Sequence, residues 1–303
     1  MLPLELREEI LKLPETDNHS IAIVTGNWPR HKRFAYRVQK EFGKSVIAWY
    51  ELDGSQKTRY TAYGRIKDQL SSTSKNRLFL RLLKKILSGV NFVQHDNSYE
   101  MSALITEKEF FKKEIEELET FSVIKPKKIN PADVHSREFV DELRKINPYF
   151  LLTLGGPLYA KPLIEAARGI AINQHAGHSP VLKGNNTTDW ALYHRQIKYV
   201  SSTVHMLTSG ADAGPILRRS NPCIFPYDAY QTILPRVVAL GTELMIEVVG
   251  DIIKDKRLII FRQPREIGRT YLAKEFTDNI RNAILRDFNT GWLCKELSRL
   301  RQF

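Results

Sequence analysis

Short apolar runs alternate with amphipathic stretches along most of the chain. Residues 20–24 (SIAIV) and 45–50 (SVIAWY) are apolar runs typical of buried strands. Between them, apolar residues recur at four-residue steps over 34–42, which indicates one face of a helix that ends at Gly43. A strand, a helix and a strand in this order form a βαβ unit, so this part of the chain predicts a parallel sheet.

The alternation continues toward the C-terminus. Residues 148–154 (PYFLLTL), 169–172 (GIAI) and 199–207 (YVSSTVHML) predict three more strands. Amphipathic spacing predicts helices over 106–119, 139–146, 159–168, 187–196 and 227–253. Strands that alternate with helices over most of a chain are typical of a doubly wound α/β domain. We therefore expect a Rossmann-like, mainly parallel sheet flanked by helices.

The two ends of the chain have a different character. Residues 1–19 mix acidic, basic and apolar side chains and predict a short amphipathic N-terminal helix. Residues 257–303 carry a mostly helical pattern and are too short for a full second core. We therefore expect one α/β domain over residues 1–256. The C-terminal extension is expected to pack on that domain or on another subunit, as in a homodimer.

The chain is basic, with 46 Lys and Arg against 34 Asp and Glu and a formal net charge of +12. Such an excess suits anionic partners, which are phosphates, nucleotides, nucleic acid or acidic lipid, although a solvated basic surface has the same composition. Residues 65–90 concentrate the charge, with seven basic side chains against one acidic one. That segment predicts either a surface helix with a basic outer side or an anion-binding face.

Cysteine usage and hydropathy indicate the compartment in which the protein is expected. Cys223 and Cys294 are the only two cysteines in the sequence. Two isolated cysteines form no disulfide framework and no zinc-type pair, so we expect reduced thiols in a cytoplasm-like compartment. No stretch approaches about 18 consecutive apolar residues, so no membrane span is expected.

Polar side chains with catalytic potential follow two of the predicted strands. Asn173 and His175 come at the end of one strand, and Asp212 lies between two glycines in the loop after another. Ligands gather at the carboxyl ends of strands in open parallel sheets. An amide can stabilise an oxyanion, an imidazole can move a proton, and a carboxylate can orient the imidazole. This combination is suited to acyl transfer.

Three motifs stand in order within residues 148–218: N-x-H at 173–175, S-P-x-x-x-G at 179–184 and D-x-G-P at 212–215. Together they resemble the N10-formyltetrahydrofolate-dependent formyltransferase family, which includes glycinamide ribonucleotide transformylase, methionyl-tRNA formyltransferase and the sugar N-formyltransferases. The stretch T-G-N-x-x-R-H at 25–31 adds weaker support and is similar to the sugar-modifying and related branches.

The resemblance implies a formyltransferase that uses N10-formyltetrahydrofolate as the formyl donor and needs no metal. It identifies Asn173, His175 and Asp212 as the catalytic residues, with His205 in a supporting role. It places the donor along Gly155, Gly156, Pro157, Leu158, Tyr159, Leu207, Thr208 and Ser209. It places the acceptor near Asn27, Arg30, Lys183, Asn185 and Trp190.

The implied reaction moves a formyl group to a primary amine. Asn173 and His175 would stabilise the formyl oxygen, and Asp212 would orient His175 and help to remove the amine proton. Gln174 stands where the family more often has an apolar or small residue, and Lys183 keeps the charge of a frequent Arg. His178 is expected either to bond within its own loop or to join the site.

The residues do not identify the molecule that accepts the formyl group. A nucleotide-linked amino sugar fits both the resemblance and the basic composition. Methionyl-tRNA is an alternative because a basic chain can bind RNA phosphates, although that enzyme normally carries a C-terminal β-barrel and the tail here reads as helical. Formylation of another small amine, or a non-catalytic basic scaffold of the same fold, are the remaining alternatives.

Overall fold

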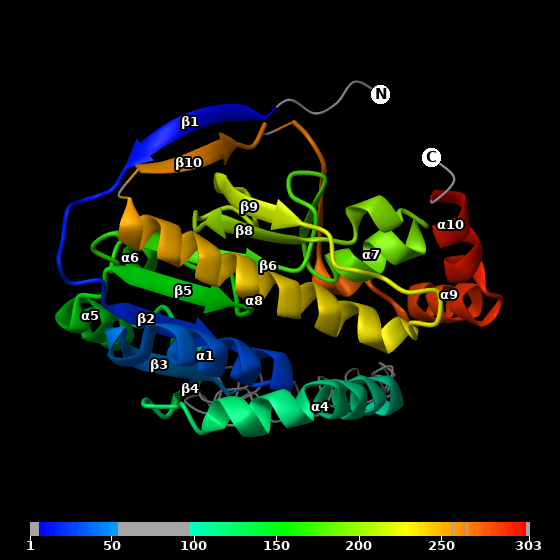
Figure 1. Cartoon of the computed structure of the whole chain (residues 1–303), viewed down its shortest axis with the longest axis horizontal. Coiled ribbons are helices and arrows are strands. Elements are labelled where there is room, and N and C mark those ends of the chain that lie inside the picture. Colours follow the sequence, from blue (N-terminus) through cyan, green and yellow to red (C-terminus); the bar gives the residue numbers. More distant parts are fainter. Residues whose placement is uncertain (1–5, 54–96, 256, 265, 301–303) are drawn as a thin grey trace, which may run out of the picture.

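A nine-stranded sheet runs through the middle of the molecule (Figure 1). The structure is a computed structural model that describes residues 6–53, 97–255, 257–264 and 266–300. From one edge of the sheet to the other, the strands are β1 (Arg7–Lys12), β10 (Arg257–Arg262), β9 (Ile216–Ser220), β8 (Ser202–Met206), β6 (Ile170–His175), β5 (Phe150–Leu154), β2 (Ile21–Thr25), β3 (Val46–Leu52) and β4 (Lys127–Ile129).

The sheet has a parallel half and an antiparallel half. Strands β4, β3, β2, β5 and β6 run parallel to their neighbours. Strands β8, β9, β10 and β1 continue the sheet in antiparallel pairs, beginning at β6. The predicted Rossmann-like α/β fold is confirmed. The loop between β8 and β9 is too short for a crossover connection, so these two strands pair antiparallel.

Helices cover both faces of the parallel half, and the strands bury both of their sides. Along β2, Ile21 and Ile23 join one core cluster while Ala22 and Val24 join the other, as expected for side chains that alternate between faces. The first face carries α1 (Pro29–Phe42), α4 (Asn97–Glu119) and α8 (Tyr230–Lys254), which crosses in front of the sheet in Figure 1. The second carries α5 (Arg137–Ile146) and α6 (Lys161–Ile164).

A third apolar cluster joins the C-terminal helices to the rest of the chain. It contains Trp190 from α7 (Thr187–Tyr193), Ile284 from α9 (Asp278–Asn289) and Leu293 from α10 (Trp292–Leu300). Nearby, β7 (Leu182–Gly184) and β11 (Arg269–Tyr271) form a small parallel pair. The helical C-terminal region therefore packs against α7. The division at residue 256 stays a prediction, and β10, which follows it, lies inside the central sheet.

The predicted N-terminal helix over 1–19 is wrong in the part that the structure describes. Residues 7–12 form strand β1, which pairs antiparallel with β10 across the full length of both strands. Glu9 also forms an ion pair with Arg262 at 2.8 Å. The open edge of β10 offers a row of backbone partners, and these outweigh the weak helical preference of a short Glu- and Leu-rich segment.

The remaining predicted elements agree in position, with two differences. The helix expected over 159–168 is the single turn α6, and the helix expected from 106 begins at Asn97. The basic segment 65–90 lies outside the described residues. No helix in the described ranges is long and apolar enough to cross a membrane.

Candidate functional site

A row of polar side chains crosses three adjacent strands. Thr153 of β5 lies beside Asn173 of β6, and Asn173 lies opposite His205 of β8. Neighbouring residues in a sheet project from the same face, so the three side chains meet. The Thr153 hydroxyl donates to Asn173 Oδ1 at 2.7 Å, and Asn173 Nδ2 lies 3.1 Å from His205 Nε2.

Gln174 points to the opposite face, as strand alternation requires. Its Nε2 donates to the Val238 carbonyl of α8 at 2.8 Å, and the Thr242 hydroxyl, which donates to the same carbonyl at 3.0 Å, lies 3.4 Å from its Oε1. This polar residue at a buried position therefore ties β6 to α8. Asn173 and His175, on either side of it in sequence, line the cavity, and Gln174 reaches the same cavity wall from the α8 side.

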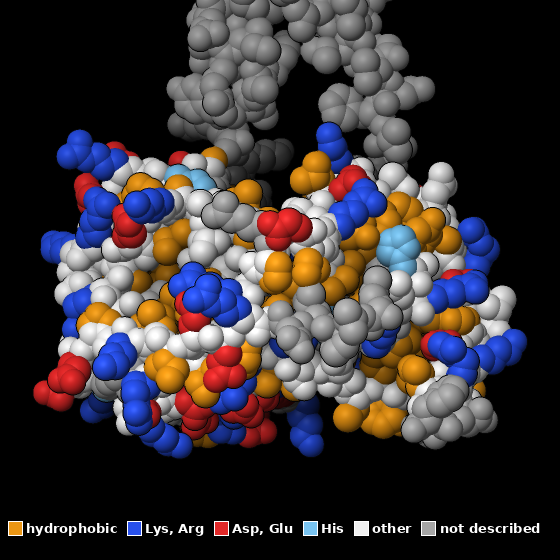
Figure 2. Space-filling view, turned by 90° about the horizontal axis from the view of Figure 1, so that it is seen from above, with side chains coloured by type: hydrophobic (Ala, Val, Ile, Leu, Met, Phe, Trp, Pro, Cys, Tyr) orange, Lys and Arg blue, Asp and Glu red, His pale blue; other side chains and the backbone are white. Residues whose placement is uncertain are grey.

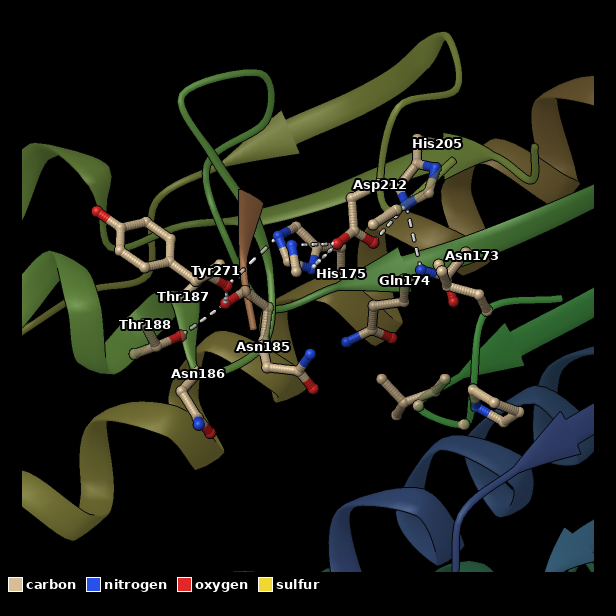
Figure 3. Close-up of a pocket in the computed structure, with 18 of the residues that line it drawn as sticks. Asn173, Gln174, His175, Asn185, Asn186, Thr187, Thr188, His205, Asp212 and Tyr271 are labelled. Carbon is tan, nitrogen blue, oxygen red and sulfur yellow. Dashed lines mark hydrogen bonds and ion pairs between the residues drawn. The ribbon is translucent and has the colours of Figure 1, made fainter. Parts of the chain in front are cut away.

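Asp212 comes from the loop between β8 and β9 and lies between two imidazoles (Figure 3). Its Oδ2 is 3.3 Å from His175 Nδ1, and its Oδ1 is 3.3 Å from His205 Nε2. The Gly184 amide donates to Oδ2 at 2.7 Å, and Asp212 has a φ of 47°, which brings its side chain back toward β6. The structure thus brings together Asn173, His175 and Asp212, and adds His205 to them.

The electrostatics of the cluster favour an ionised carboxylate. Burial raises the pKa of Asp212, but the His175 imidazole, the His205 imidazole and the Gly184 amide outweigh burial and hold that pKa below its usual range. Burial also lowers the pKa of His175, against the Asp212 carboxylate, which raises it. Asp212 is therefore charged at neutral pH, while burial favours the neutral form of His175.

The other edge of the His175 ring has neutral neighbours. Its Nε2 lies 3.1 Å from the Leu182 carbonyl and 3.3 Å from the Thr187 hydroxyl. A hydrogen bond to an ionised group is about twice as strong as one between neutral groups. Nδ1 is therefore held by Asp212, and Nε2 can donate to a developing anion only when the ring carries a second proton.

These groups lie on the wall of a cavity of about 460 Å³. Its lining includes most of the predicted donor-binding residues, namely Gly155, Gly156, Pro157, Leu158, Tyr159, Leu207 and Thr208. Ser209 is outside this lining. Arg30 and Asn185, from the predicted acceptor set, also line the cavity.

The other three predicted acceptor residues lie outside the cavity wall. Trp190 stacks on Tyr271 with ring centroids 4.5 Å apart and belongs to the apolar cluster of α7. Asn27 donates through Nδ2 to Asp53 Oδ1 at 3.2 Å. Lys183 is buried in β7. His178 also lies outside this wall, and its Nδ1 is 3.0 Å from the hydroxyl of Ser201, the residue before β8.

Several cavity residues were not selected as site residues from the sequence, although one of them, His31, ends the T-G-N-x-x-R-H stretch. Tyr271 reaches the wall from the C-terminal region, about 100 residues after the triad loop, because β11 pairs with β7. His31 lies under the glycines of two loops: a Cβ added at Gly26 would lie 2.5 Å from His31 Cε1, and one at Gly155 would lie 2.9 Å from His31 Nε2. These two glycines make room for the imidazole beneath the cavity.

We expect the protein to lose stability as the pH falls from about 7 to about 4. Burial lowers the pKa of three histidines, His31, His175 and His178, the last to about 4. The unfolded chain takes up protons near pH 6.5 that the folded chain refuses, so each histidine costs at most about 1.4 kcal/mol of unfolding free energy per pH unit within that window. Urea unfolding at several pH values measures the slope.

A matched variant isolates one of these contributions. His178→Asn removes one buried imidazole that lies outside the cavity wall, so its stability should depend less steeply on pH than that of the wild type. A free energy of unfolding that stays constant or rises as the pH falls from 7 to 5 would contradict the assignment of neutral buried histidines.

Residues 83–249, more than half of the chain, match the family model described as formyl transferase. The chain belongs to the formyl transferase family. Within the family, it is 27% identical over 164 residues to a methionyl-tRNA formyltransferase of Thermodesulfovibrio yellowstonii, covering 52% of each chain. This formyl transferase therefore spans about half the length of the curated relative that it matches.

Solved structures of similar fold are more distant in sequence. A sugar N-formyltransferase from Shewanella sp FDAARGOS_354 is 14% identical, with a TM-score of 0.49, and the match covers 88% of this chain and 87% of that one. A phosphoribosylglycinamide formyltransferase from Bacillus halodurans is 13% identical, with a TM-score of 0.47 and coverage of 78% and 96%.

Proposed function

We propose that this formyl transferase moves a formyl group from N10-formyltetrahydrofolate to a primary amine. The observation that carries the proposal is the meeting of Asn173, His175 and Asp212 at the wall of one cavity, with the Asp212 carboxylate 3.3 Å from the His175 ring. An amide donor, an imidazole and a buried carboxylate are the groups that acyl transfer to an amine requires.

The proposed roles follow from the contacts of each side chain. The amine nitrogen would bond to the formyl carbon of the donor, and negative charge would develop on the formyl oxygen. The bond from that carbon to N10 would then break as N10 takes a proton and tetrahydrofolate leaves. Asn173 Nδ2 would donate to that oxygen, and His175 Nε2 would do so when the ring carries a second proton, the form that the Asp212 carboxylate stabilises. Asp212 would hold His175 through Nδ1 and receive the amine proton, directly or through water. His205, on the other oxygen of Asp212, would fix the position of the carboxylate.

The donor is proposed to lie along the 155–159 and 207–208 loops. Gly155 and Gly156 have φ values of 74° and 101°, so their backbone groups turn toward the cavity in a conformation that suits glycine. A Cβ added at Gly156 would lie 2.3 Å from the Tyr159 hydroxyl oxygen. Backbone polar groups beside Leu158 and Leu207 fit a pterin, which offers a hydrogen-bonding edge and two apolar faces.

The acceptor is proposed to enter from a second cavity of about 730 Å³ that adjoins the first. Arg30, Asn186, Asp189 and Leu234 line both cavities. The second wall carries the following cations, carboxylates and aromatic rings: Arg30, Lys274, Arg281, Glu107, Asp189, Asp278, Trp28, Tyr230 and Phe276. Arg30 pairs with Glu107 and Arg281 pairs with Asp278 within this wall. The support for a nucleotide-linked amino sugar therefore comes from Lys274, which suits a phosphate, and from the aromatic rings, which suit a base.

Asp189 is a suitable anchor for the amine of that acceptor. The Tyr230 hydroxyl donates to its Oδ1 at 2.6 Å, which fixes the carboxyl group between the two cavities. Burial raises the pKa of Asp189 to about 6, although the Tyr230 hydrogen bond opposes the rise. At neutral pH the group is therefore a carboxylate that can hold an ammonium ion beside the triad.

Methionyl-tRNA is the second candidate acceptor, because the curated relatives carry that enzyme's name and the chain has a net charge of +12. On the face seen in Figure 2, the described Lys and Arg side chains are scattered over the surface among acidic ones. RNA binding through phosphates would be recognised by a steep fall in affinity with salt.

The test measures folate binding and transfer with a panel of acceptors. Purified protein should bind folinic acid, a stable donor analogue, and should formylate nucleotide-linked amino sugars at a higher kcat/KM than the free amino sugars. Transfer to methionyl-tRNA alone would favour the second candidate. Failure to bind folinic acid, together with no transfer to any acceptor, would refute the proposed function.

A further inference from the structure

His31 lies in the first turn of α1 and belongs to the wall of the first cavity, but it has no role in the proposed chemistry. Its side chain is buried, with the residue only 7% exposed. Gly26 and Gly155, which follow β2 and β5, pack closely against its ring. Asn173 of β6 lines the same cavity, and β6 is the next strand after β5. A buried imidazole and the catalytic side chains therefore share one space.

One nitrogen of this ring is committed to the start of the helix. The backbone N–H of Trp28 donates to His31 Nδ1 at 3.0 Å. A backbone N–H can only donate, so Nδ1 must offer its lone pair, and the proton of the neutral ring is on Nε2. Burial and the neighbouring Arg30 cation hold the pKa of His31 well below its usual range. The ring at neutral pH is therefore uncharged and carries one N–H, at Nε2.

The Nε2 atom is open to the cavity. Within the part of the chain that the structure describes, it has no hydrogen-bond partner. It is also not among the unpartnered polar atoms of that part that solvent cannot reach. A Cβ added at Gly155 would lie 2.9 Å from Nε2, so the glycine leaves this nitrogen uncovered. Since His31 is part of the cavity wall, Nε2 is a donor that a ligand in the cavity can use.

The surroundings of His31 favour an uncharged oxygen over a phosphate. Anions often bind at the N-terminus of a helix, but in α1 that place is taken by the Glu107 carboxylate. Glu107 accepts from the Arg30 backbone N–H at 2.7 Å, pairs with the Arg30 guanidinium, and has a side chain only 3% exposed. A phosphate at His31 would meet a neutral ring near a buried carboxylate. A hydroxyl or carbonyl oxygen needs only the N–H that Nε2 supplies.

We propose that His31 binds the acceptor by donating its Nε2–H to a hydroxyl or carbonyl oxygen of the sugar. The inference rests on the proposed function, in which the acceptor enters from the second cavity. Arg30, the residue before His31, lines both cavities, so His31 lies where the two meet. Neighbouring strands lie about 4.8 Å apart, so β6, which carries Asn173, is about 5–10 Å from the strand ends beside His31. A sugar ring whose amine lies beside Asn173 can present another substituent to His31.

The kinetic test compares two variants at this position. His31→Leu keeps the side chain apolar and removes both nitrogens, whereas His31→Gln keeps an acceptor for the Trp28 N–H and a donor for the cavity. The acceptor is the nucleotide-linked amino sugar that the wild type uses with the highest kcat/KM. We expect His31→Leu to raise its KM about tenfold, which corresponds to about 1.4 kcal/mol, with kcat and the Kd of folinic acid within about twofold of the wild type. His31→Gln should recover most of the lost affinity.

A matched control replaces an imidazole outside the cavity. His178→Leu makes the same change at a largely buried ring that does not line either cavity, and it should leave the KM of the acceptor unchanged. Three results would each overturn the proposal: an unchanged KM in His31→Leu, an equal rise in His31→Leu and His31→Gln, or a loss that falls on folinic acid binding instead.

A spectroscopic test uses the wild type and does not depend on the folding of His31→Leu. In histidine-labelled protein, the His31 nitrogen signals, assigned from their absence in His31→Gln, should be those of a neutral ring protonated at Nε2. Adding the acceptor to the folinic acid complex should move the Nε2–H proton signal to lower field, as expected for a new hydrogen bond. A ring protonated at Nδ1, or an Nε2–H signal that the acceptor does not move, would overturn the proposal.

The two tests separate the failure of this inference from the failure of the proposed function. No formyl transfer by the wild type with any acceptor would refute the function and, with it, the assignment of His31 to the acceptor. Normal transfer with an unchanged KM in His31→Leu would leave the function intact and overturn the role of His31 alone.

Discussion

Replacing Asp212 by Asn is expected to lower kcat for formyl transfer by about 10³–10⁴-fold while the protein stays folded. Asp212 is the single carboxylate between the His175 and His205 rings, at 3.3 Å from each. The asparagine side chain has the same shape as the carboxylate, and its oxygen can still accept from the Gly184 backbone N–H. It carries no negative charge, and its NH₂ group cannot accept a hydrogen bond. Loss of the carboxylate from a catalytic triad, with geometry kept, costs about 10⁴-fold in kcat. Single-turnover kinetics with saturating donor measures the effect.

A matched surface variant controls for the loss of one carboxylate. Asp251, on α8, forms an exposed ion pair with Arg218 of β9. Asp251→Asn removes that pair and should leave kcat unchanged. Asp212→Asn should still bind folinic acid, because the predicted donor loops do not depend on this charge. Near-normal turnover in Asp212→Asn would refute the role assigned to the carboxylate.

The central elements could be predicted because their signal is local. Residues 20–24 and 150–154 are apolar on both sides, and the structure buries them completely between two helical layers. The glycine after α1 also marks the end of that helix. Asn173, His175 and Asp212 could be selected because each follows or ends a strand, and strand ends gather at one edge of a sheet.

What could not be predicted depends on contacts between distant parts of the chain. Residues 7–12 are a strand only because β10, about 250 residues later, offers them an edge. Tyr271 reaches the cavity only through the pairing of β11 with β7. Trp190 was expected near the acceptor, but its stacking on Tyr271 makes it part of the cluster that holds α7 in place.

Thr153 is the clearest case of a residue whose contact with Asn173 is set by register. Within its strand it reads as an ordinary β-branched residue in an apolar run. Only the pairing of Thr153 with Asn173, and of Asn173 with His205, places its hydroxyl under the amide. A shift of one residue in the register of β5 would turn this hydroxyl to the other face and break the row.

His175→Ala is expected to lower kcat by about 10³-fold and to leave folinic acid binding within a few-fold of the wild type. The ring is the group that Asp212 orients, and its loss removes a donor to the formyl oxygen. His178→Ala is the matched control, because that imidazole is also largely buried but bonds to Ser201 outside the cavity. It should keep its kcat at pH values where it remains folded.

The double variant His175→Ala with Asp212→Asn decides whether the two residues act as a unit. If Asp212 works mainly by holding His175 through Nδ1, its carboxylate has little left to do once the ring is gone. The double variant should then be about as slow as the slower single variant, because members of one catalytic unit are strongly non-additive. If the two losses multiplied to about 10⁶-fold or more, the residues would act independently, and the amine proton would reach Asp212 without the ring. Because Asp212 also contacts His205 at 3.3 Å, a small remaining effect of Asp212→Asn in the His175→Ala background would measure that second contact.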